Sequence, residues 1–130
     1  MPKRAETLDK KLLYLFYVYG KALSKKRVHE LVYLLQEKYG VKLGFKFYGN
    51  PPLSMDLDER LSSLVEKGYL KVLYVVGENY LTLYKPYYKL TEKGEKIAEK
   101  KDFAKTDMKK INQLVEDVKQ KKVSGIVSKT

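Results

Sequence analysis

The chain has 130 residues, of which 44% are hydrophobic and 33% charged, enough to bury one core and stay soluble. Lys and Arg number 27 against 16 Asp and Glu, a formal net charge of +11. This charge excludes a nearly neutral scaffold and indicates a polyanionic partner, either nucleic acid or an anionic surface. The lack of Cys excludes disulfides, thiolate zinc sites and cysteine nucleophiles. Abundant Lys and Glu without Cys are also typical of thermophile proteins.

The longest apolar run, residues 12–19, is far shorter than the roughly 20 residues that span a bilayer. Glu6 and Asp9 interrupt the basic start that a signal peptide needs, and residues 21–24 make a poor cleavage site. We therefore expect a buried helix in a cytoplasmic protein with no membrane partner.

Apolar residues at helical spacing predict three helices, over about residues 7–19, 24–38 and 54–67. Each begins at a residue that can cap a helix and ends at a glycine. The predicted caps and stops are, in chain order, Thr7 and Gly20, Ser24 and Gly40, and Ser54 and Gly68.

Extended segments are predicted around the third helix. Residues 41–50 are typical of a short strand or an ordered loop, and Asn50-Pro51-Pro52 forces a turn after them. Residues 69–76 are rich in β-branched and aromatic side chains, which predicts a strand. We then expect a turn at 77–79, an extended segment at 80–84, a second turn at Lys85-Pro86 and a last strand at 87–90.

Thr91 can cap a fourth helix, and apart from Gly94 no residue from 92 to 122 breaks a helix. Apolar residues in this stretch form a narrow seam over about three heptads. The seam either folds back on the domain or pairs with a second copy, and we favour a homodimer. The predicted organisation is a domain at 1–94 with a basic N-terminal arm, a C-terminal helix at 95–123 and a flexible tail at 124–130. The predicted dimer residues are Ile97, Ala104, Met108, Ile111, Val115 and Val118.

The order of helices followed by a hairpin and a long helix predicts an α+β winged helix-turn-helix. Two phrases support it: Lys67-Gly68-Tyr69-Leu70, and Tyr88-Lys89-Leu90-Thr91-Glu92-Lys93-Gly94 about 20 residues later. With these phrases, residues 7–100 resemble the winged-helix superfamily, and in particular its small archaeal regulator-like domains. The resemblance implies a three-helix core, a β-hairpin wing and DNA binding. Because the superfamily also contains protein-docking and RNP modules, fold analogy alone does not decide the function.

The resemblance implies a third helix that enters the major groove, but here that helix is acidic. Residues 51–70 carry two basic and four acidic side chains, whereas residues 1–50 carry eleven and four. In the second helix, Lys25, Lys26 and Arg27 follow the cap directly and oppose the helix dipole, each at a cost of about 0.3–1 kcal/mol. A phosphate bound there would turn this cost into a stabilising interaction with the three cations. The alternative is a basic turn that is simply solvated.

We therefore predict a nucleic-acid site at the start of the second helix, extended by neighbouring cations. The aromatic-basic run at 84–89 could stack on bases or contact the backbone, but tyrosines in such a run more often pack the sheet. The predicted site residues are Lys10, Lys11, Lys21, Lys25, Lys26, Arg27, Arg60, Ser62, Ser63, Lys67 and Lys85.

The sequence offers no convincing enzyme. His29, the one histidine, is expected on an exposed helix face, and the carboxylates of the third helix have no His or Cys companion for a metal. We expect no cofactor, no metal and no catalysis. The expected function is a double-stranded DNA-binding transcription regulator or chromatin-associated factor that contacts mainly phosphates. The alternative is a docking subunit of a ribonucleoprotein, ribosomal, replication or transcription assembly.

Overall fold

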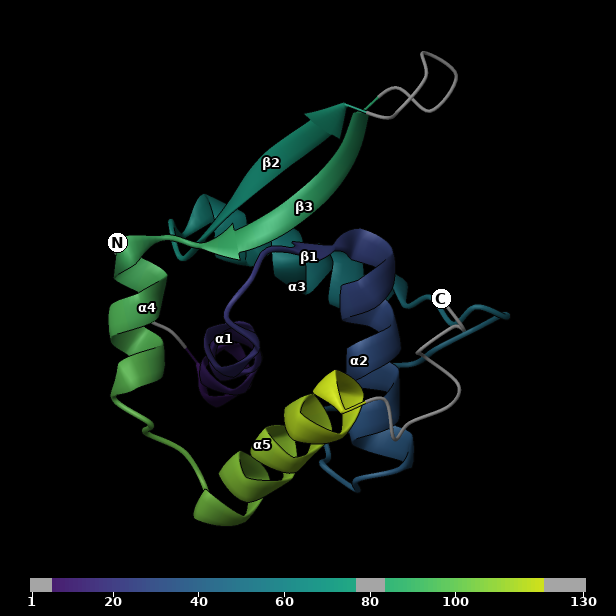
Figure 1. Cartoon of the computed structure of the whole chain (residues 1–130), viewed down its shortest axis with the longest axis vertical. Coiled ribbons are helices and arrows are strands. Elements are labelled where there is room, and N and C mark those ends of the chain that lie inside the picture. Colours follow the sequence, from purple (N-terminus) through teal and green to yellow (C-terminus); the bar gives the residue numbers. More distant parts are fainter. Residues whose placement is uncertain (1–5, 77–83, 121–130) are drawn as a thin grey trace.

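The computed structural model describes residues 6–76 and 84–120 (Figure 1). In these ranges the chain is α+β, with five helices and one antiparallel sheet of strand order β1-β3-β2, a layout compatible with a winged helix. No helix in the described ranges is long and apolar enough to cross a membrane. The elements are α1 Thr7–Tyr19, β1 Leu23–Ser24, α2 Lys25–Glu37, α3 Met55–Glu66, β2 Leu70–Val76, β3 Tyr84–Leu90, α4 Glu92–Glu99 and α5 Lys105–Lys119.

Some predictions concern other parts of the chain. The basic N-terminal arm at residues 1–5, the turn at 77–79, most of the extended segment at 80–84 and the tail at 124–130 lie outside the described residues.

Helix α1 lies at the centre of the molecule, and Figure 1 looks nearly along its axis. Leu12, Leu13 and Leu15 are almost fully buried although they point in different directions, so the helix is covered on most sides, as predicted. The predicted cap at Thr7 is wrong by one residue, because Glu6 is the N-cap. Asp9 reaches back to this end of the helix and accepts a hydrogen bond of 3.0 Å from the Glu6 backbone N–H.

The predicted starts of α2 and α3 are confirmed. The Ser24 hydroxyl accepts a hydrogen bond from the backbone N–H of Arg27, and the Ser54 hydroxyl accepts one from that of Leu57, each at 3.2 Å. Gly68 follows α3 with φ +84°, a conformation that suits glycine. Local serine and glycine signals therefore set the ends of these helices.

The segment at residues 41–50 is an ordered loop, one of the two predicted alternatives. The Gln36 side chain pairs with the backbone of Phe45: it accepts from the N–H at 2.9 Å and donates to the carbonyl oxygen at 3.0 Å. Val41 and Leu43 are buried beside Phe45. The loop is thus held by side-chain hydrogen bonds and apolar contacts, with one antiparallel bridge between Tyr48 and Leu53.

Strand β3 runs without interruption through Lys85-Pro86, so the turn predicted there is wrong. Pro86 pairs with Tyr74 of β2. On its other side β3 meets β1 only at Tyr87 and Tyr88, which leaves Pro86 beyond the end of β1. A proline is tolerated in a strand where no neighbour needs its missing N–H.

The two phrases behind the winged-helix resemblance contact each other. Thr91 donates its backbone N–H to the Tyr69 carbonyl oxygen at 3.1 Å and its hydroxyl to the Gly68 carbonyl oxygen. Its hydroxyl also caps α4 by accepting from the Gly94 N–H at 3.1 Å. A Cβ at Gly94 would lie 2.0 Å from the Tyr69 carbonyl oxygen, so this position requires glycine.

The single C-terminal helix predicted over residues 92–122 is wrong. It is two helices, α4 and α5, joined through residues 100–104, where Lys101 has φ +49°. Figure 1 shows the chain turning between them so that α4 and α5 lie on different sides of α1. Both helices pack on α1, which a straight helix does not allow. Tertiary burial therefore overrides local helix propensity.

Of the predicted seam, three residues are buried in the chain's own core: Ile111, Val115 and Val118. Ile97 and Met108 are partly buried against that core, whereas Ala104 is the exposed N-cap of α5. Of the two predicted uses of the seam, these helices therefore follow the fold-back. The homodimer itself stays a prediction.

Candidate nucleic-acid interface

The first turn of α2 carries the three predicted cations, and two of them face carboxylates. The Lys25 ammonium lies 3.2 Å from Asp58 of α3, and an Arg27 guanidinium nitrogen lies 3.8 Å from Glu30. Both side chains of the Lys25–Asp58 pair are about two-fifths exposed, so solvent screens it and it stabilises little. Lys26 is exposed and has no carboxylate partner among the described residues. The salt bridges of Lys25 and Arg27 thus weaken the predicted anion site. Lys26 is the cation of this turn that is most accessible to an anion.

Lys10 and Lys11 tie α1 to the segment around the start of α5. Their ammonium groups lie 2.8 Å from Asp102 and 2.7 Å from Asp107, respectively. The hydrogen bond and charge of Lys10 lower the pKa of Asp102. Both lysines are thereby neutralised within the chain, which argues against their predicted role in a phosphate site.

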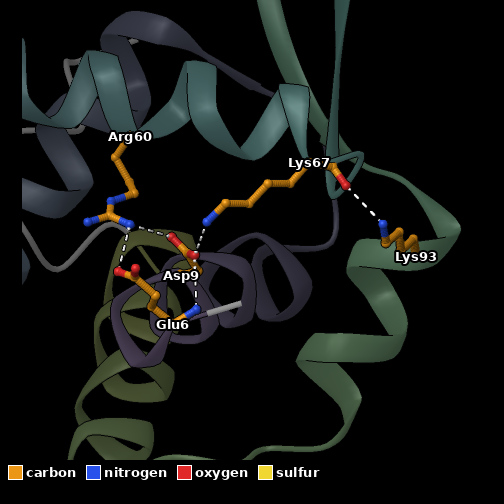
Figure 2. A network of polar contacts seen from close by, with 5 residues as sticks. All are labelled: Glu6, Asp9, Arg60, Lys67 and Lys93. Carbon is orange, nitrogen blue, oxygen red and sulfur yellow. Dashed lines mark hydrogen bonds and ion pairs between the residues drawn. The ribbon is translucent and has the colours of Figure 1, made fainter. Parts of the chain in front are cut away.

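Two predicted cations, Arg60 of α3 and its C-cap residue Lys67, point toward α1 (Figure 2). The Arg60 guanidinium lies 3.1 Å from Asp9 and 3.1 Å from Glu6, and the Lys67 ammonium lies 2.9 Å from Asp9. Asp9 has no exposed surface and the Lys67 side chain is 8% exposed. Arg60 and Lys67 therefore compensate a buried carboxylate, which is a structural task that the sequence did not reveal.

The exposed surface of α3 is left acidic. Asp56, Glu59 and Glu66 are exposed, and among the described residues they have no cation within salt-bridge distance. Ser62 is exposed and Ser63 is half-buried, so both predicted serines are accessible. A duplex brought against this helix would meet carboxylates rather than cations, which repels phosphates.

The outward face of the β2–β3 pair is basic. Lys71 of β2 lies directly opposite Lys89 of β3, and Leu73 lies opposite Tyr87 on the same face. Both lysines are exposed and, within the described residues, neither has a carboxylate partner. Like charges directly opposite each other destabilise a sheet, so their pairing favours an anion between them. Lys85 continues β3 with its backbone opposite Val75.

Two further predicted cations flank this face. Lys21 lines a shallow hollow with Lys89, which Glu95 also borders. Lys26 lines another with Tyr87 and Pro86. Lys21 precedes β1 and Lys26 follows it in the first turn of α2, and β1 is the strand that pairs with β3. We call Lys21, Lys26, Lys71 and Lys89 the basic hairpin face.

Sequence reasoning missed Lys71, and it included Lys89 only as the end of the run at 84–89 and not among the predicted site residues. Their alternation with Val72 and Tyr88 along the two strands was the available signal. That alternation places each lysine on a solvent face, but only the register of the pair sets the two lysines opposite each other.

The prediction of an exposed His29 is wrong, because the side chain is 1% exposed. Its Nδ1 lies 2.8 Å from the Lys25 carbonyl oxygen and its Nε2 lies 3.1 Å from the Ser54 carbonyl oxygen. The ring therefore links the start of α2 to the cap of α3. In the described ranges no three His, Asp or Glu side chains gather in a way that could hold a metal ion.

Comparison of the chain with protein-family models, with curated proteins and with solved structures finds no match. The winged-helix resemblance therefore stays a prediction, which the layout of helices and strands accommodates.

Proposed function

We propose that the chain is a winged-helix protein that binds double-stranded DNA through phosphate contacts, as a transcription regulator or chromatin-associated factor. The observation that carries this proposal is the basic hairpin face, where Lys71 and Lys89 lie opposite each other and neither pairs with a carboxylate of the described residues. A row of DNA phosphates supplies the missing countercharge and gains affinity from released counterions. Tyr87, between these cations and Lys26, offers a ring and a hydroxyl to the backbone.

The proposal changes the surface first predicted. The cations of α3 are bound to Asp9, and the helix exposes carboxylates. We therefore place the duplex against the hairpin and the start of α2, with α3 turned away from the phosphates. Such binding depends on backbone charge and discriminates little between sequences.

The test is a salt titration of binding to a random-sequence duplex, followed by fluorescence anisotropy. We expect the double variant Lys71→Glu and Lys89→Glu to bind at least about tenfold more weakly and to lose about two units of log–log salt slope. The matched control is Lys105→Glu with Lys109→Glu, which makes the same charge change on exposed lysines of α5. Equal losses in both variants, or an unchanged slope in the first, would remove the hairpin from the interface.

A second candidate is a docking subunit of a larger nucleic-acid assembly. It is favoured by the acidic surface of α3, which suits a basic protein better than DNA. Its test is the size of the native protein in extracts of its own cells. Co-migration with a large particle, together with no binding to free duplex, supports this candidate, whereas a small species that binds duplex supports the first.

A further inference from the structure

A groove separates α3 from the inner face of the β2–β3 pair. Residues from the helix make one wall, and alternate residues of the two strands make the other. Its main lining residues are Asp58, Ser62 and Glu66 from α3, and Val72, Tyr74 and Tyr88 from the strands.

The sheet side of this groove is apolar and open. Tyr88 is 7% exposed and forms part of its floor, Val72 is half-buried, and Tyr74 is 66% exposed. Val72 and Tyr74 are two residues apart in β2, so their side chains share one face. An exposed tyrosine beside a partly covered apolar floor is typical of a surface that receives an apolar side chain.

The helix side of the groove is negatively charged. Glu66 is exposed and, within the described residues, has no cation partner. Asp58 is paired with Lys25 at the edge of the groove, in a bridge that solvent screens. Burial raises the pKa of the Tyr88 hydroxyl, and the Asp58 carboxylate adds to that rise. Asp58 and Tyr88 both line the groove, so a carboxylate borders its floor.

The strand that borders the groove also has a free edge. The sheet order β1-β3-β2 makes β2 a terminal strand, and within the described residues no backbone group pairs with its outer edge from Lys71 to Val76. Such an edge accepts an extended peptide as an additional strand, and the alternate side chains of that peptide then enter the neighbouring groove.

We propose that this groove is a docking site for an extended segment of another protein, with apolar residues at its centre and Lys or Arg on both sides. The apolar centre covers Val72 and Tyr74, while the flanking cations meet Glu66 and Asp58. This docking site rests on the second candidate function, that of a docking subunit, and gives it a surface and a partner of defined chemistry. It does not require that the chain bind DNA. The lining of the groove carries two carboxylates, Asp58 and Glu66, against one cation, Lys25, which disfavours nucleic acid as its occupant.

The test is a titration of the isotopically labelled full chain, followed by amide chemical shifts. The probe is a synthetic peptide with a Val-Leu-Val centre and two Lys/Arg residues on each side. The comparison peptide has the same centre between Asp/Glu pairs. We expect the basic peptide, at about 1 mM or below, to shift amides of β2 and of α3 around Glu66. The acidic peptide should leave them unchanged.

The double variant Glu66→Lys and Tyr74→Ser should weaken basic-peptide binding at least about tenfold. The matched control is Glu37→Lys with Tyr48→Ser, which changes an exposed glutamate and a 67% exposed tyrosine outside the groove. Amide spectra establish that both variants are folded. Equal binding of the two peptides, shifts confined to other elements, or equal losses in both variants would overturn the proposal.

The random duplex is titrated into the same labelled protein. If the duplex shifts only the basic hairpin face and the peptide shifts nothing, the groove proposal fails while DNA binding stands. If the peptide shifts the groove and the duplex shifts nothing, the docking site stands without DNA binding. Duplex-induced shifts in the groove would overturn its assignment to a protein partner.

Discussion

Asp9 is a carboxylate without exposed surface, and its partners come from α3 and from the backbone of Glu6 (Figure 2). A buried charge is tolerated only where cations and hydrogen-bond donors compensate it. This requirement explains why Arg60 and Lys67, which were predicted to be part of a nucleic-acid site, turn toward α1. The sequence shows the three charged residues but not their distances, so their mutual compensation was not predictable from it.

Replacing Asp9→Asn should destabilise the chain by about 3–5 kcal/mol, because Lys67 and Arg60 would be left without their buried countercharge. Urea unfolding followed by circular dichroism measures the loss. The control is Asp102→Asn, which removes an exposed carboxylate that also forms a salt bridge and should move the urea midpoint little. Similar midpoint shifts in the two variants would contradict a special role for the Asp9 network.

Local sequence signals determine where some helices begin, whereas tertiary packing determines where the C-terminal helices are broken. Ser24 and Ser54 act through their own hydroxyls, so the starts of α2 and α3 were predictable from the sequence. The break at residues 100–104 has no such signal, because it arises where α4 and α5 both pack on α1. The same limit applied to the candidate interface, since the opposition of Lys71 and Lys89 depends on the register of the strands.

Helix α5 is attached to the core by burial and by polar contacts with α1 and with the segment that follows α2. The Tyr14 hydroxyl donates to Asn112 at 3.0 Å, and the Tyr39 hydroxyl donates to Asp117. Burial, followed by the bond to Asp117, raises the pKa of Tyr39 to about 12. These contacts favour α5 as part of the folded monomer rather than as a separate dimerisation helix.

Val115→Asp should therefore unfold or strongly destabilise the chain, by about 3 kcal/mol or more, because it places an unpaired carboxylate in the core. The control is Ala104→Asp, which puts the same side chain at the exposed N-cap of α5 and should stabilise by about 0.5–1 kcal/mol. Thermal unfolding with size-exclusion chromatography distinguishes the alternatives. A folded, stable Val115→Asp monomer from a dimeric parent would show that the seam joins two copies.

In the molecule as a whole, the two proposed surfaces centre on opposite faces of the same two strands and adjoin at the start of α2, where Lys25 and Pro86 border hollows of both. Lys71 and Lys89 point to one face, and Val72 and Tyr88 to the other, because successive side chains of a strand alternate. The cations of the basic hairpin face have no carboxylate partner in the part of the chain that the structure describes, while the groove face is bordered by Asp58 and Glu66. The arrangement would allow the chain to connect a nucleic acid to a basic protein segment.

Two ligands on opposite faces should bind together. We expect the basic peptide to bind the chain with the same affinity, within about a factor of three, whether or not the protein is saturated with duplex. The peptide affinity is measured with and without duplex, at constant ionic strength, from the chemical shifts of groove amides. These shifts report only on peptide bound in the groove, because peptide bound to free DNA does not change them. The control adds the acid-flanked peptide to the same complex and should shift no groove amide. If duplex displaces the basic peptide from the groove, the two ligands share one surface, and the division of the hairpin into a DNA face and a protein face is wrong.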